Sequence, residues 1–359
     1  MGWTQEELAN RAGFSAHQIV SQIELGQREI KAAELFRITG ALHLDLSSLA
    51  SGMPTPAPVV LWRKKSDATP AAREARFLER CRRYRSLSMA VEQVTADPLP
   101  QYPVDAENVG YTFAEDVASR FGSLLDLGPC PAASLAETLT NRFDVQVWHE
   151  DLGTDGSAAC SRGDFGAAVM INASDAPWRR NFDLAHELFH LVTWEALSPD
   201  LLARDEELAG RAERCADVFA SNLLLPADAV GAEMDRRRHD GGVKWADLID
   251  VARNFEVSTE ALLWRLKSLR RVTADQVLEL KKDESFKRLD RASRSGAWWR
   301  PAPFPERFVR RAFLASMNGY LSHARLAEFL DTNLAGLPQI LAEYGLQEDE
   351  DYQRTLCTA

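Results

Sequence analysis

The sequence predicts an α+β fold that is mainly helical and built from several domains. At 359 residues the chain exceeds the roughly 100 to 200 residues of a typical domain, which indicates two to four units. Most segments have apolar residues at helical spacing, whereas Val145 to His149 and Gly166 to Asn172 have the pattern of strands. Hydrophobic residues make up 45% and charged residues 26%, which is enough for a sizeable core.

Composition excludes several classes of protein. The net charge of -11 argues against nonspecific nucleic-acid binding by the chain as a whole. Neither a signal peptide nor an apolar run near the roughly 20 residues of a membrane span is present, so we expect a cytoplasmic location. The odd number and wide spacing of the cysteines predict reduced thiols: Cys81, Cys130, Cys160, Cys215 and Cys357.

The first predicted elements are short helices. Thr4 and Glu7 have the spacing of a helix capping box, as do Ser15 and Gln18, and the glycine between the two segments suits a tight turn. A third amphipathic helix is expected from about Ala32 to Leu42. The order is therefore helix, turn, helix, and a further helix.

Residues 1–52 resemble the helix-turn-helix domain of Xre-type regulators. The resemblance lies in Trp3 to Ala9 (Trp-Thr-Gln-Glu-Glu-Leu-Ala), in the Ala-Gly turn and in Ile23 to Arg28. Such domains have another helix ahead of this segment, so we expect the unit to lack its first helix or to begin further upstream. The resemblance implies that the helix at about Ala16 to Ile23 enters the major groove of DNA. Its exposed polar candidates are His17, Gln18 and Ser21.

The charge of this unit leaves an alternative open. Residues 1–52 hold four basic and six acidic residues, a poor electrostatic footprint for DNA. A protein-docking or vestigial helical module is therefore as well supported as DNA binding.

Residues 53–105 are predicted to be a linker and an arginine-rich helix. Four prolines and several small residues in 53–72 are typical of an extended linker. A helix is expected from Ala71 to about Ala96. Its arginines predict a solvated helix face, with a contact to DNA or an acidic partner as the alternative. They are Arg73, Arg76, Arg80, Arg82, Arg83 and Arg85.

Residues 106–270 contain the segments on which function depends. Two helices between 112 and 143 are followed by the two strands and then by a helix with the run His-Glu-Leu-Phe-His. His186 and His190 are four residues apart on this helix, so both imidazoles can reach one Zn²⁺ while Glu187 points to its open side. The helix is apolar nearly all round, and buried histidines and a buried glutamate are costly unless something binds them.

A catalytic zinc usually takes three protein ligands and leaves a fourth position for water. Glu213 is the best candidate for the third ligand, because the apolar face of its helix would pack against the first helix. Asp217, one turn later on the same face, is expected to accept a hydrogen bond from a ligand imidazole and fix its tautomer.

The two motifs together resemble the ImmA/IrrE family of metallopeptidases. The resemblance covers about residues 110–270 and rests on Asn181 to His190 and on Glu213 to Pro226, which ends Leu-Leu-Leu-Pro. It implies a zincin-like peptidase domain in which His186, His190 and Glu213 bind zinc. Glu187 would take a proton from the attacking water and deliver it to the leaving amine.

Three smaller expectations concern the surroundings of this site. The strand that ends Val-Met-Ile-Asn172 is expected to be an edge strand that aligns an extended substrate. Arg265 is expected to be exposed on a supporting helix that closes the domain. His149 and His239 are conceivable oxyanion donors, although ordinary surface histidines are the favoured interpretation.

Residues 271–359 are predicted to form a C-terminal helical domain. A charged helical connector fills 271–300, and helices follow from Glu306 to about Leu346. Their cadence is that of a second small helix-turn-helix, and an interaction bundle is equally well supported.

The main functional prediction is a zinc-dependent endopeptidase that cleaves a protein substrate. By analogy with the family, this substrate is a transcriptional repressor in bacterial stress response or mobile-element regulation, with DNA contacted through residues 1–52. The alternative is a DNA-binding transcriptional regulator or antitoxin-like protein with a structural or regulatory metal site. The motifs favour the enzyme, because a structural site needs no Glu187 beside an open position.

Overall fold

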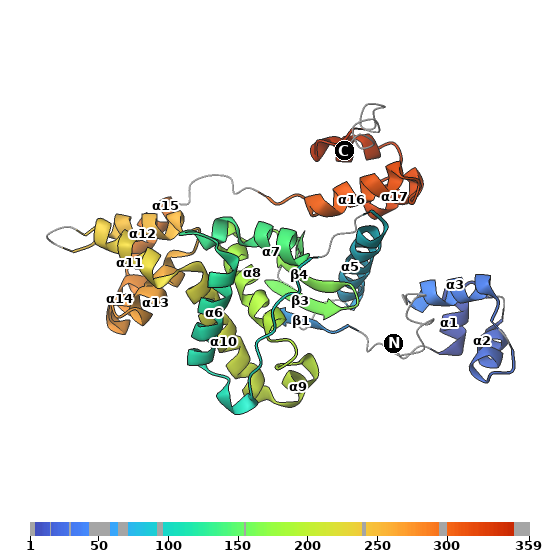
Figure 1. Cartoon of the computed structure of the whole chain (residues 1–359), viewed down its shortest axis with the longest axis horizontal. Helices are drawn as coiled ribbons and strands as arrows, with labels where there is room; N and C mark the ends of the chain where they lie inside the picture. The colour runs from blue at the N-terminus through green and yellow to red at the C-terminus, as the bar shows by residue number, and fades with distance from the viewer. Residues whose placement is uncertain are drawn as a thin grey trace. The chain divides into compact units, whose positions relative to one another are not determined.

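The computed structural model describes residues 4–14, 16–28, 30–42, 58–63, 71–91, 96–153, 156–238, 242–293 and 300–347. These residues are mainly helical and include one four-stranded sheet, which confirms the α+β class (Figure 1). The chain divides into two compact units, Met1–Ala57 and Pro58–Ala359.

The first unit is a small three-helix module. Its helices are α1 (Gln5–Arg11), α2 (His17–Glu24) and α3 (Ala32–Leu42). The capping box at Thr4 is present, and Gly13 has a φ of +68°, the left-handed conformation that the predicted turn needs. Helix α2 begins after Ala16 without a side-chain cap, and Ser15 of the second predicted capping box lies outside the described residues.

The sheet of the second unit has the order β1-β3-β4-β2. Its strands are β1 (Val60–Arg63), β2 (Gln146–Glu150), β3 (Ala158–Gly163) and β4 (Gly166–Asn172). Strand β3 is antiparallel to both β1 and β4, while β2 and β4 are parallel.

Two expectations about the strands are wrong. Strand β4 lies in the centre of the sheet, between β3 and β2, and is not an edge strand. Strand β1 falls in the segment expected to be a linker, because the β-forming run Val-Leu-Trp pairs with β3. The short sequence of β3, Ala-Ala-Cys-Ser-Arg-Gly, was not predicted as a strand because its small residues show no apolar alternation.

One face of the sheet packs against the helices that bear the two motifs. Val169 and Ile171 of β4 belong to a core shared with α6 (Tyr111–Leu125), α8 (Pro177–Val192) and α10 (Glu206–Leu224). All residues of α8 from Asp183 to its end are buried, as its apolar pattern predicts. Helix α10 packs against both α8 and α6.

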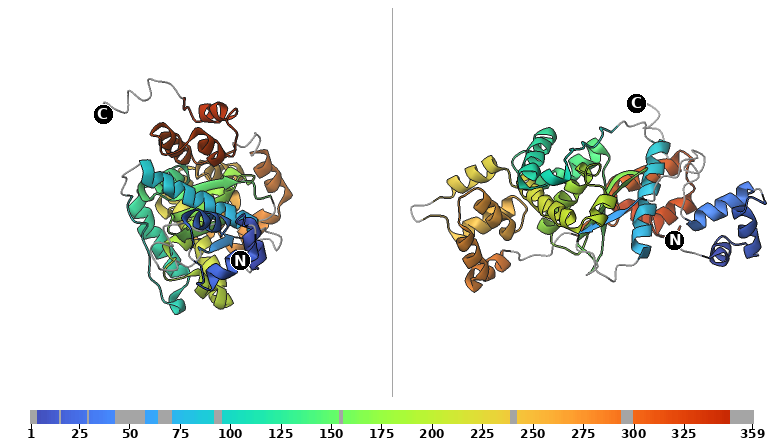
Figure 2. Two further views of the ribbon diagram at one scale, coloured as in Figure 1. Left: turned by 90° about the vertical axis from the view of Figure 1, so that its right-hand side faces the viewer. Right: turned by 90° about the horizontal axis from the view of Figure 1, so that it is seen from below.

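The opposite face packs against α5 (Ala71–Val91) and the C-terminal helices. Ala168 and Met170 of β4 join a second core with α16 (Glu306–Met317), α17 (His323–Phe329) and α18 (Leu337–Glu343). Figure 2 shows α5 alongside α16, with which it is in contact. Both faces of β4 are therefore buried, which explains its continuous apolar run.

The arginines of α5 are more than a solvated face. Arg73 and Arg76 contact Glu150 at 2.9 and 3.0 Å, and Arg80 contacts Asp331 at 2.6 Å. These ion pairs join α5 to β2 and to the end of α17. Part of the predicted positive surface is thus neutralised within the chain.

The remaining helices surround the motif-bearing core. They are α7 (Leu135–Phe143), α9 (Pro199–Arg204), α11 (Ala227–Arg236), α12 (Trp245–Asn254), α13 (Thr259–Ser268), α14 (Ala274–Lys282) and α15 (Glu284–Ala292). Among the described residues, no helix combines the length and apolar character that a membrane crossing requires. Cys81, Cys130, Cys160 and Cys215 are free thiols.

Candidate metal centre

Two buried histidines of α8 meet a carboxylate of α10. The Nε2 of His186 lies 3.2 Å from Oε2 of Glu213, and the Nε2 of His190 lies 3.4 Å from Oε1 of the same residue. One ligand atom from each residue lies within 4.8 Å of the other two. Zinc bonds of about 2.0–2.2 Å in tetrahedral geometry place ligand atoms about 3.3–3.6 Å apart, so this spacing fits a zinc ion.

The contacts of His186 also fit a cation better than a hydrogen bond. Its Nε2 is buried and has no hydrogen-bond partner, although the Glu213 carboxylate is close by. A buried nitrogen without a partner is costly in a folded protein, and a metal bound between nitrogen and carboxylate would satisfy both. Two imidazoles and one carboxylate are a donor set that zinc uses in catalytic sites.

Asp217 holds the other side of the His186 ring. Its Oδ1 lies 2.9 Å from Nδ1 of His186, the contact expected of a residue that fixes the imidazole tautomer. Burial lowers the pKa of His186, but the hydrogen bond to Asp217 and the Glu213 carboxylate outweigh burial and raise it to about 9. Burial raises the pKa of Glu213, yet the two histidines together lower it well below its ordinary value.

Glu187 lies on the sheet side of this cluster. It is 1% exposed, and its Oε1 has no hydrogen-bond partner. One neighbour on the sheet is Cys160 of β3, whose thiol pKa is raised by burial and further by the Glu187 carboxylate. Glu187 therefore lies buried beside the cluster, with one carboxylate oxygen that has no hydrogen-bond partner.

Two residues of this network were not predicted from the sequence. Arg63 of β1 lies 2.9 Å from Asp183 and 3.0 Å from Asp217, and thus bridges the two carboxylates. Burial raises the pKa of Asp183 to about 6, against the opposing effect of Arg63 and Arg179. Asp183 lies one helical turn before His186, so its spacing could have identified it as a neighbour of the metal ligands. No local pattern in the sequence connects Arg63 to this helix.

The predicted oxyanion donors are not part of the cluster. His149 lies on β2 and is half-buried, so it is less exposed than the surface histidine that was favoured. Burial and then the neighbouring Arg180 lower the pKa of His149 to about 4. His239 lies outside the described residues.

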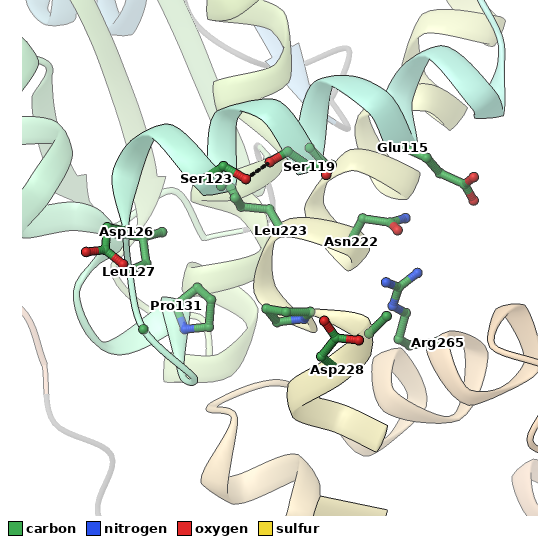
Figure 3. A pocket seen from close by; sticks show the side chains of 15 residues that line it. Glu115, Ser119, Ser123, Asp126, Leu127, Pro131, Asn222, Leu223, Asp228 and Arg265 are labelled. Atoms are coloured by element: carbon green, nitrogen blue, oxygen red, sulfur yellow. Dashed lines mark hydrogen bonds between the residues drawn. The ribbon is translucent and has the colours of Figure 1, made fainter. Parts of the chain in front are cut away.

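The expectation of an exposed Arg265 is wrong. Arg265 is 6% exposed, because its guanidinium turns inward and its Nε donates to the carbonyl oxygen of Leu225 at 2.8 Å. This bond anchors α13 to the end of α10. Arg265 lies beside Asn222 in a cavity of about 620 Å³ that Glu115 also lines (Figure 3).

The predicted DNA-contacting residues all lie on α2 of the first unit. His17 and Gln18 are exposed, and Ser21 is half-buried. His17 and Ser21 are one turn apart and share a face of the helix.

Comparisons with known proteins agree with this division. Residues 140–267 match the IrrE N-terminal-like domain, a family of peptidases, and residues 1–49 match a helix-turn-helix family. The chain combines an IrrE N-terminal-like peptidase domain with a helix-turn-helix domain. The IrrE-like match includes α8 and α10 with the whole candidate centre, together with β2, β3 and β4. Strand β1 and Arg63 lie outside it.

Several solved chains are similar to this one, among them a structure that matches part of its length. It is titled a Mycobacterium tuberculosis transcriptional regulator and shares 21% identity, with a TM-score of 0.32. The match covers 52% of this chain and 51% of that one, so the chain spans about half the length of that protein. No curated protein matches this sequence.

Proposed function

We propose that the IrrE-like domain is a zinc-dependent endopeptidase. His186, His190 and Glu213 would hold the metal. The observation on which this rests is the convergence of their ligand atoms around a buried Nε2 that has no hydrogen-bond partner, directly beside the buried Glu187.

The residues around the centre suit hydrolysis of an amide bond. Bound zinc would lower the pKa of a water toward about 7 and polarise the scissile carbonyl. Glu187 accepts a proton from the attacking water and donates it to the leaving amine. Asp217 keeps the His186 ring oriented through Nδ1.

The substrate and setting are further parts of this proposal. The helix-turn-helix domain supports DNA binding through residues 1–49, with His17, Gln18 and Ser21 as candidate contacts. A peptidase domain fused to such a module favours a transcriptional repressor as the substrate, in bacterial gene regulation in the cytoplasm.

Metal analysis and peptide hydrolysis on matched variants test the proposal. Purified wild-type chain should bind zinc stoichiometrically, and His186→Ala should lose it. Glu187→Gln should keep the metal but lose about 10²- to 10⁴-fold in the rate of peptide or repressor cleavage, because only the proton acceptor is removed.

The same variants separate the enzyme from its rival. A transcriptional regulator with a structural metal would show equal, background cleavage in wild type and Glu187→Gln. Retained cleavage by Glu187→Gln at the wild-type rate would remove Glu187 from the mechanism.

A further inference from the structure

Strand β1 occupies an edge that the peptidase domain would otherwise leave open. The IrrE-like match contains β2, β3 and β4, in which β3 is the outer strand next to α8. Strand β1 comes from a distant part of the sequence and pairs antiparallel with β3, with Leu61 opposite Cys160 and Arg63 opposite Ala158. Strand β1, which lies outside the IrrE-like match, thus pairs with the sheet edge next to α8, the helix that bears both histidines.

The side chains of β1 alternate between the two faces of the sheet. Leu61 packs against the core that contains α8, and its neighbour in the register, Cys160, adjoins Glu187. Arg63 points to the same face and contacts Asp183 and Asp217. Because Asp217 also holds Nδ1 of His186, β1 is connected to a candidate metal ligand through a single carboxylate.

This arrangement has the form of a bound peptide. An extended segment that adds to a sheet edge gains main-chain hydrogen bonds, while alternate side chains are read by pockets on one face. In β1 the alternate side chains are an apolar residue and, two positions later, an arginine. Segments that peptidases cleave bind in an extended form as well, because this form lets their main-chain groups pair with a sheet edge.

We propose that β1 occupies the edge of β3 at which a substrate peptide would bind. Strand β3, together with Asp183 and Asp217, recognises an extended peptide in which an apolar residue is followed two positions later by an arginine. The inference rests on the proposed function, because it takes the neighbouring centre as the cleavage site. A substrate segment must displace β1, so the chain restrains its own activity.

The charges and the space around Arg63 support this specificity. The Asp183 side chain is 3% exposed, and a buried carboxylate needs a cationic or hydrogen-bonding partner. A guanidinium can bridge two carboxylates through its fork of donors. A cavity of about 880 Å³ begins at Arg63, Asp183 and Asp217 and extends along α13 to Trp264, with room for residues that follow the arginine.

A peptide-binding experiment tests the inference without needing catalysis. The protein is the full chain with zinc and Glu187→Gln, which prevents cleavage of the probe. The probe is a fluorescein-labelled peptide with the sequence of residues 58–66, and the matched control peptide has Arg63→Glu. In a second chain, Leu61→Ser and Arg63→Ala loosen β1, while Val60→Ala, on the opposite face of the same strand, is the control substitution.

The expected affinities follow from competition for one edge. The probe should bind the loosened chain at least about tenfold tighter than the chain with intact β1 or with Val60→Ala, because an occupied site lowers apparent affinity. The control peptide should bind at least about tenfold more weakly, since it brings a carboxylate to the buried Asp183 and to Asp217. Asp183→Asn in the loosened chain should weaken the preference for arginine.

Hydrogen exchange gives a second measurement that does not depend on the folding of the loosened chain. Excess probe added to the chain with intact β1 should increase exchange of the amides of residues 60–63, while those of β3 stay protected. Equal binding by the intact and loosened chains, equal binding of both peptides, or unchanged exchange in β1 would overturn the inference. Probe binding without any hydrolysis by the wild type would instead reject only the proposed function.

Discussion

At the scale of single residues, the candidate centre depends on groups that have no contact with the ligand atoms themselves. Asp217 is the clearest case, because its Oδ1 contacts both Nδ1 of His186 and Nη2 of Arg63. The carboxylate pKa is lowered overall, since the His186 hydrogen bond and Arg63 outweigh the effect of burial. Asp217 therefore stays ionised and fixes which nitrogen of His186 faces Glu213.

Replacing this carboxylate should weaken metal binding without removing a ligand. We expect Asp217→Asn to reduce zinc affinity about 10- to 100-fold, because the His186 ring loses a charged acceptor that sets its tautomer. Competition with a chromophoric chelator measures the change. Asp200→Asn, on α9, is the matched control, and equal zinc affinity of the two variants would show that Asp217 does not orient the ligand.

The residues of the centre differ in how far the sequence could reveal them. His186, Glu187 and His190 follow from the spacing on one helix, and Glu213 from the apolar face of a second, so local periodicity was sufficient. Arg63 could not be found in this way, because its place beside Asp217 depends on the pairing of β1 with β3. Long-range strand pairing leaves no local periodic signal.

At the scale of elements, the sheet shows where patterns mislead. The continuous apolar run of β4 indicates a buried strand, but such a run does not say which neighbours bury it. Its parallel partner β2 places His149 opposite Ile171, beside the buried helix start at Arg180. A histidine on an alternating strand was expected at the surface, whereas His149 is half-buried near Arg180.

This burial makes the stability of the sheet pH-dependent. The pKa of His149 is about 4 in the folded chain and about 6.5 when unfolded, so the unfolded state binds the extra proton between these values. Its contribution is fully present above pH 6.5 and is lost as pH falls toward 4. The free energy of unfolding of wild type should fall by about 1 to 2 kcal/mol more than that of His149→Gln between pH 7 and 5. Denaturant unfolding measures this difference, and parallel pH curves for the two proteins would contradict it.

At the scale of the whole second unit, one sheet separates two cores. Helices α14 and α15 join the core of the candidate centre through Val277 and Phe286, whereas α16 to α18 join the core on the opposite face. The helical pattern of the sequence predicts a single C-terminal domain from residue 271, whereas the helices of this segment contribute to both cores. Composition and proline breaks mark where helices end, but they do not specify which face of a sheet a helix covers.

Phe308 tests whether the C-terminal helices are an integral layer of the second unit. It is fully buried, with its ring centroid 5.1 Å from that of Trp148 on β2 and 6.2 Å from that of Tyr84 on α5. Phe308→Ala should lower the free energy of unfolding by about 3 to 5 kcal/mol, because it opens a cavity against the sheet. The exposed Tyr320 supplies the control, Tyr320→Ala, for which we expect a change within about 0.5 kcal/mol. If the layer is integral, zinc release and unfolding of α16 occur in a single unfolding transition, and Phe308→Ala lowers the midpoint of both together. If α16 to α18 of Phe308→Ala unfold before zinc is released, and zinc release keeps the wild-type midpoint, these helices fold as a separate domain.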